Sequence, residues 1–114
     1  MSASEYFISK GFSPKQKSRA VDEGAAVAVW TPQTSTRVAI TDLTISAGSA
    51  GTIAFYWGNV NGDKIAEFLV AGSVSLTPAI GCWEGTAYDR SLFAVAVLGA
   101  TDNFRINLTG FELT

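Results

Sequence analysis

The feature that most constrains this chain is a series of short segments in which apolar and polar residues alternate. In residues 52–57, the large apolar side chains Ile53, Phe55 and Trp57 occupy every second position. A period of two is the pattern of a β-strand that buries one face, because successive side chains of a strand point to opposite sides. Further strand-like segments occupy residues 25–30, 37–46, 64–71, 74–76, 92–98 and 103–113, of which 25–30 and 92–98 are apolar throughout.

Turn-forming residues separate these segments. Glycine, serine and alanine fill residues 47–51, and Asn61-Gly62 is a dipeptide that favours tight hairpins. No segment has the sustained three- and four-residue apolar spacing of an amphipathic helix. Seven or eight short strands at even spacing predict an all-β fold, which we interpret as a single antiparallel β-sandwich, jelly-roll-like, over residues 24–114.

Three strand segments carry further information about their neighbours. Residues 92–98 are apolar on both faces, which predicts a central strand whose small side chains face a neighbour. The segments 37–46 and 103–113 each change the phase of their apolar residues part-way. Such a change keeps one face buried only with a bulge or a crossing between sheets, and Gly110 suits a bulge. We therefore expect these two strands to lie side by side and to bend together.

Residues 1–23 differ from the rest of the chain. They are rich in serine and lysine, yet they contain several large apolar side chains. This mixture predicts an extended N-terminal arm that is loosely structured alone and carries apolar side chains that could dock on another surface. An arm lying across its own domain, a flexible tail and an arm that contacts another molecule all remain open.

Composition argues against an enzyme. The chain has no histidine and one cysteine, Cys82, which removes the Ser-His-Asp triad and most zinc sites and leaves a free thiol. The carboxylates are scattered singly, and the turn at 59–63 lacks the glutamate of a calcium-binding EF-hand. We expect no catalytic residues, no cofactor and no metal.

Charge and hydropathy give no sign of nucleic-acid or membrane partners. The net charge is −2 at pH 7, so the basic residues of the arm give at most a weak, salt-sensitive attraction to nucleic acid. No apolar run approaches the roughly 20 residues of a membrane-spanning helix, and no signal peptide is visible at the N-terminus.

The connection at residues 78–91 is long for a compact domain, and long connections are often functional. It carries Trp83, Tyr88 and Arg90, which belong to the residue types enriched at binding hot spots. Two interpretations remain open. The loop binds a protein or a carbohydrate, with Trp83 as a stacking platform, or Trp83 plugs one end of the sandwich.

The layout of the chain resembles the small β-sandwich decoration, or cement, proteins of tailed-phage capsids. The resemblance is carried by a polar arm followed by TDLTISAG at 41–48, GTIAF at 51–55 and the closing GFEL at 110–113.

This resemblance implies a non-enzymatic virion protein, made in the host cytoplasm, that binds the major capsid protein at the capsid surface as a homotrimer. It also implies that the arm contacts the shell or a neighbouring copy. The alternative is a receptor- or carbohydrate-binding module of a tail fibre or spike, using Trp83, Tyr88 and Trp57. The arm residues to which the resemblance assigns contact are Tyr6, Phe7, Ile8, Lys10, Phe12, Lys15, Lys17 and Arg19.

Overall fold

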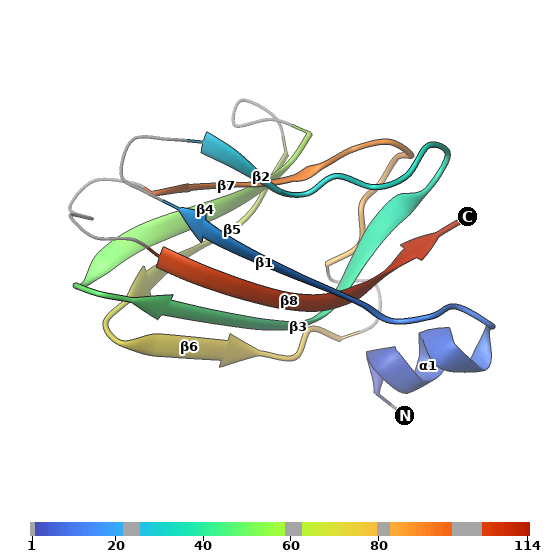
Figure 1. Cartoon of the computed structure of the whole chain (residues 1–114), viewed down its shortest axis with the longest axis horizontal. Helices are drawn as coiled ribbons and strands as arrows, with labels where there is room; N and C mark the ends of the chain where they lie inside the picture. The colour runs from blue at the N-terminus through green and yellow to red at the C-terminus, as the bar shows by residue number, and fades with distance from the viewer. Residues whose placement is uncertain (1, 22–25, 59–62, 80–82, 97–103) are drawn as a thin grey trace.

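The computed structural model describes residues 2–21, 26–58, 63–79, 83–96 and 104–114 as two four-stranded antiparallel sheets packed face to face, with one short helix (Figure 1). The elements in chain order are helix α1 (Ala3–Ser9) and strands β1 (Lys15–Val21), β2 (Ala26–Trp30), β3 (Arg37–Ala47), β4 (Gly51–Trp57), β5 (Asp63–Val70), β6 (Ser73–Leu76), β7 (Leu92–Ala96) and β8 (Phe104–Leu113).

The strand order defines a jelly roll. Sheet A runs β1-β8-β3-β6 and sheet B runs β2-β7-β4-β5. The first strand pairs with the last, β2 with β7, β3 with β6 and β4 with β5, all antiparallel. This nested pairing is the eight-stranded, two-sheet arrangement of the jelly roll, so the predicted fold class is confirmed.

The alternating residues form the core between the sheets. Ile53, Phe55 and Trp57 of β4 are buried, and β7 lies between β2 and β4 as the predicted central strand. On β7 the smaller face, with Ala94 and Ala96, points into the core. Its larger side chains lie on the outer face of sheet B.

The two long strands with a phase change are neighbours, as expected. β3 and β8 pair from Arg37↔Leu113 to Ala47↔Phe104, and both turn toward sheet B at the right-hand end of Figure 1. The phase change in β3 is a bulge at Thr41, since the register shifts between Ile40 and Asp42.

The phase change in β8 has a different cause, which corrects the prediction of a bulge at Gly110. Phe111 and Leu113 point away from the main core and pack with Ala39 against Ala3 and Phe7 of α1 in a second apolar cluster. An apolar residue on the outer face of a strand needs no bulge when another element covers that face.

The N-terminal segment differs from the expected extended arm. Residues 3–9 form a helix, whose N-terminal Ser2 and Glu5 make a capping box that satisfies free backbone N–H groups. Residues 15–21 form β1, which pairs with β8 along its whole length. The sandwich therefore begins before Gly24, because the jelly roll needs β1 to complete sheet A.

Several sequence-based expectations lie outside the described residues. These are the hairpin at Asn61-Gly62, the state of Cys82 and the end of the apolar segment at Leu98.

Candidate functional site

Helix α1 holds the aromatic residues of the predicted arm against the end of sheet A. Phe7 is buried, and its ring centroid lies 5.2 Å from that of Phe111. Tyr6 and Phe12 are partly buried beside it, whereas Ile8 is 51% exposed. The helix therefore uses most of its apolar surface within the chain, and Ile8 remains available to a partner.

A hollow beside the helix brings together parts of the two predicted contact regions. Its volume is about 420 Å³. Tyr6, Lys10 and Phe12 line it together with Arg37 and Glu84, whose side chains form an ion pair of 3.0 Å.

Three basic residues of the predicted arm, Lys15, Lys17 and Arg19, lie on β1, whereas Lys10 lies at the end of α1. Lys17 pairs with Leu108 and Arg19 with Ile106, so their side chains share the core-facing side of the sheet. Both are exposed because β1 is an edge strand. The ammonium of Lys17 lies 5.6 Å from the ring centroid of Trp30.

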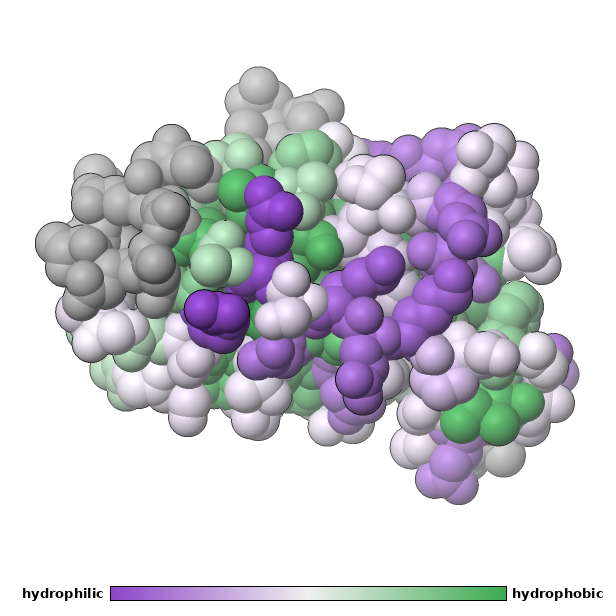
Figure 2. Space-filling model, in the orientation of Figure 1, coloured by the Kyte–Doolittle hydropathy of each residue, from purple (hydrophilic) through white to green (hydrophobic). Residues whose placement is uncertain are grey.

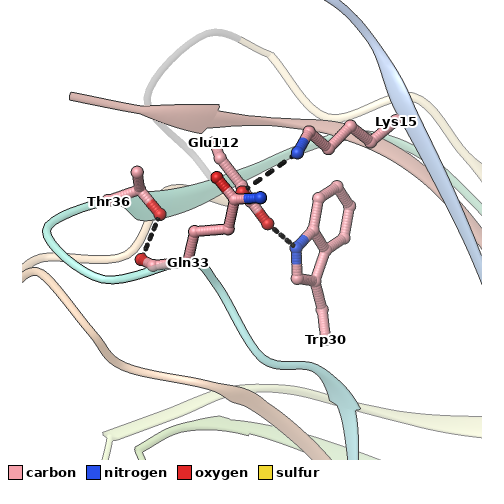
Figure 3. A network of polar contacts seen from close by, with 5 residues as sticks. All are labelled: Lys15, Trp30, Gln33, Thr36 and Glu112. Carbon is pink, nitrogen blue, oxygen red and sulfur yellow. Dashed lines mark hydrogen bonds and ion pairs between the residues drawn. The ribbon is translucent and has the colours of Figure 1, made fainter.

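Lys15 belongs to a polar network around Glu112 (Figure 3). The Lys15 ammonium lies 3.2 Å from one carboxylate oxygen of Glu112, and the Trp30 indole N–H donates to the other at 2.9 Å. Burial alone would raise the pKa of Glu112. The hydrogen bonds from Trp30 and Lys15, the charge of Lys15 and a backbone hydrogen bond from Gln33 outweigh burial and lower the pKa below its ordinary value.

This network predicts an acid-sensitive contribution to stability. A carboxyl group with a lowered pKa in the folded state stabilises the fold above its unfolded-state pKa of about 4.3 and loses that contribution as the pH falls. We expect Glu112→Gln to lower the free energy of unfolding at pH 7 by about 1.5–3 kcal/mol, the usual range for hydrogen bonds to charged groups. Urea unfolding at several pH values should show that the difference from the wild type shrinks below about pH 4. A difference that stays constant with pH would contradict this assignment.

The loop around Trp83 packs against the core, and the Trp83 side chain is not exposed to solvent as a binding surface would be. Trp83 is only 8% exposed, and its ring packs on Phe55 and Phe68 at centroid distances of 5.5 and 6.3 Å. The backbone N–H of Ile40 donates to the carbonyl of Trp83, and that of Gly85 donates to Val38. This geometry favours the packing interpretation of Trp83 over a stacking platform for sugars.

The other two loop residues have different roles. Arg90 donates to Asp63 at 2.7 Å and to the backbone carbonyl of Trp57 at 2.8 Å, so it ties the loop to the end of β4 and the start of β5. Gly58 has a positive φ, and a Cβ there would meet the Arg90 guanidinium at 2.8 Å. Tyr88 is 53% exposed and remains a surface residue. Because Trp57 is also buried, neither tryptophan of the carbohydrate-binding alternative is exposed.

The outer face of sheet A is polar. Pairing across β1, β8, β3 and β6 places hydroxyl and amide side chains on this side, and purple and white side chains cover the centre of the view in Figure 2. A shallow groove of about 440 Å³ crosses β1, β8 and β3 there. The outward residues are Gln16, Ser18, Ala20, Asp42, Thr44, Ser46, Ser73, Ser75, Arg105, Asn107 and Thr109.

The outer face of sheet B has the opposite character. Leu69 on this face is 75% exposed, and Phe93 and Val95 of the central strand are only half-buried. Lys64 and Glu67 are the charged members of this face and pair with each other at 2.7 Å. The outward residues are Ala26, Ala28, Thr52, Ala54, Tyr56, Lys64, Glu67, Leu69, Phe93 and Val95.

Sequence reasoning did not identify this apolar face as a candidate surface, although a signal for it exists. The segment at 92–98 is apolar at every position, and its larger residues, Phe93 and Val95, lie on the outer face. A central strand that is apolar on both faces predicts a second apolar neighbour on its outer side, but the helix α1 packs on sheet A and not on sheet B.

The described residues contain no group of three or more side chains suited to hold a metal ion. They also contain no helix long and apolar enough to cross a bilayer.

Comparison with known proteins supports the fold. No protein-family model matches the sequence, and no curated protein matches it. A chain of the cyanophage Pam1 capsid asymmetric unit is similar in structure, with a TM-score of 0.54 and 13% identity over 90% of this chain and 86% of that one.

Two further solved structures are less similar. A protein of the disulfide-linked pili of Bacillus endospore appendages gives a TM-score of 0.49 at 18% identity, covering 90% of this chain and 91% of that one. A protein of the virus-like particle of the prawn Macrobrachium rosenbergii extra small virus gives a TM-score of 0.41 at 8% identity, covering 91% of this chain and 80% of that one.

Proposed function

We propose that this chain is a non-enzymatic structural protein of a virion, which decorates the capsid by binding the major capsid protein at the outer surface of the shell. It would be made in the host cytoplasm and join the particle there. The cyanophage capsid chain has a similar fold, which is compatible with this role.

The observation that carries the proposal is the chemical opposition of the two outer faces. An apolar face that includes Leu69, Phe93 and Val95 lies on the opposite side of the sandwich from a face made mostly of hydroxyl, amide and charged groups. Exposed apolar patches on small proteins mark interaction sites, because covering them removes apolar area from water. Sheet B therefore suits contact with the shell, and sheet A suits solvent at the virion surface.

Apolar burial accounts for the stabilisation that a decoration protein provides. Each Å² of apolar area removed from water contributes about 25 cal/mol before the costs of association. Many copies on one shell then act together, so each contact can be modest in affinity.

A charge on the apolar face should weaken this binding. We expect Phe93→Lys to weaken binding to shells assembled from the major capsid protein of the same genome by about 10–100-fold. The substitution removes an apolar contact worth about 1.5–3 kcal/mol and leaves an unpaired charge in the interface. Co-sedimentation of purified protein with undecorated shells measures the affinity.

Ser75→Lys is the matched control, because it adds the same charge to an exposed position on the outer face of sheet A. Circular dichroism checks that both variants keep the fold. Unchanged binding of Phe93→Lys, or an equal loss for Ser75→Lys, would contradict the assignment of sheet B to the shell.

A further inference from the structure

The hollow beside α1 combines an apolar wall with polar groups that the chain itself does not fully use. Its volume of about 420 Å³ lies within the range of about 300–1,000 Å³ that is typical of small-molecule sites. Four parts of the chain line it: α1 with the residues after it, the start of β3, the loop before β7 and the end of β8. The groove of similar volume across sheet A differs, because its described lining includes no aromatic side chain.

Tyr6 and Phe12 form the apolar wall of the hollow. Both side chains are only partly buried against the cluster of Phe7 and Phe111, so each keeps part of its surface open to solvent. The Lys10 ammonium lies 5.5 Å from the centroid of the Tyr6 ring and adds a hydrogen-bond donor beside this wall. Small-molecule sites commonly combine an aromatic wall with a few convergent polar groups.

The polar side of the hollow is the ion pair between Arg37 and Glu84. One guanidinium nitrogen of Arg37 donates to one carboxylate oxygen of Glu84 at 3.0 Å, and within the described residues neither side chain makes another hydrogen bond. An arginine side chain has five N–H groups and a carboxylate has two oxygens, so most donors of Arg37 and one oxygen of Glu84 remain for a ligand. The two side chains are 34% and 18% exposed, which leaves these groups accessible from the hollow.

We propose that this hollow binds a sugar residue of a glycan. The C–H groups of a sugar ring pack against the aromatic wall, and the hydroxyl groups at its edge hydrogen-bond to Arg37 and Glu84. A hydroxyl group both donates and accepts, so a sugar serves the carboxylate and the guanidinium at the same time. An apolar side chain of a protein partner would instead cover both charged groups without giving them hydrogen bonds, which costs free energy. A purely anionic ligand would meet the negative charge of Glu84.

The position of the hollow makes this site independent of the proposed binding to a shell. Helix α1 packs on Phe111 and Leu113, which point outward from sheet A, so the hollow lies on the side of the sandwich away from the apolar face of sheet B. A copy held to a shell through sheet B would present the hollow to solvent. One sugar contact can be modest in affinity, because many copies on one particle engage a glycan-covered surface together.

The test uses the full chain in solution, without capsid protein, and an array of neutral and acidic oligosaccharides as the probe. We expect at least one oligosaccharide to bind, and an NMR titration with that oligosaccharide should shift the resonances of Tyr6, Phe12 and Arg37. Glu84→Ala should raise the dissociation constant by about tenfold or more, as expected for the loss of a hydrogen bond to a charged group. Should Glu84→Ala fail to fold, Glu84→Gln keeps the length of the side chain and should also bind more weakly than the wild type.

Glu67→Ala is the matched control, because Glu67 also belongs to an ion pair, 2.7 Å from Lys64, but lies on the outer face of sheet B. It should leave the affinity for the oligosaccharide unchanged. The absence of any bound oligosaccharide would overturn the proposal, as would an affinity that Glu84→Ala leaves unchanged or that Glu67→Ala lowers equally. A peptide from a random library that binds the wild type but not Glu84→Ala, with no oligosaccharide bound, would assign the hollow to a protein partner and overturn it as well.

Discussion

Replacing Gly110 with alanine is expected to destabilise the fold by about 3 kcal/mol or more, at the upper end of the cost of overpacking a core. A Cβ at Gly110 would collide with the backbone carbonyl of Ala39 and approach the Trp30 ring to 3.0 Å. The Ala39 carbonyl belongs to β3, which is held in place by its pairing with β8. Trp30 is 1% exposed, so neither group can move freely. Urea unfolding followed by far-UV circular dichroism measures the loss.

Gly85→Ala provides the control for this effect. Gly85 is also buried and also lies against β3, but its nearest neighbour would be the Val38 carbonyl at 3.5 Å, an ordinary van der Waals contact. We expect a change of less than about 1 kcal/mol for this variant, within the usual range of tolerated substitutions. Equal losses for the two variants would show that close approach at Gly110 is not what requires glycine.

The role of Gly110 illustrates what the sequence can predict about the long strands. The phase changes in residues 37–46 and 103–113 correctly predict that β3 and β8 are neighbours. They do not reveal that one change is a bulge and that the other reflects a helix covering Phe111 and Leu113. Both arrangements give the same apolar pattern, and only the position of α1 distinguishes them.

The N-terminal segment was predictable only in part. Ser2 and Glu5 have the spacing of a capping box, which is a signal for a helix start, but a helix of seven residues is too short to show a clear apolar period. β1 is exposed over most of its length, with Lys17 and Arg19 where a buried strand would have apolar residues. This edge strand is held in the sheet by its pairing with β8. The sequence of residues 15–21 alone does not indicate that pairing.

The candidate surfaces were also predictable only in part. Alternation predicts which residues of each strand share a face, so the polar face of sheet A follows once the sheet order is known. Apart from the pair β3 and β8, the sequence alone does not say which strands are neighbours. The apolar face of Phe93, Val95 and Leu69 gathers residues from two strands of sheet B, β7 and β5, and it therefore emerges only in the folded chain.

Trp83→Ala is expected to lower the free energy of unfolding by about 3–5 kcal/mol, as is usual for a large aromatic residue removed from a core. The Trp83 ring contacts Phe55 of β4 and Phe68 of β5, and its interplanar angle with Phe68 is 17°. The indole thus fills the end of the sandwich beside the two strands, and its loss leaves a cavity that the paired backbone cannot close. Urea unfolding monitored by circular dichroism measures the change without relying on tryptophan fluorescence.

Tyr88→Ala is the matched control from the same loop, because Tyr88 is 53% exposed and its removal should change stability by less than about 0.5 kcal/mol. Should Trp83→Ala fail to fold, Trp83→Phe keeps an aromatic ring in the site and should show a smaller loss in the same assay. A stable Trp83→Ala variant that has lost binding to a glycan would reverse the interpretation. Such a result would mean that the indole binds a ligand. If the indole instead packs on Phe55 and Phe68, its loss lowers the free energy of unfolding.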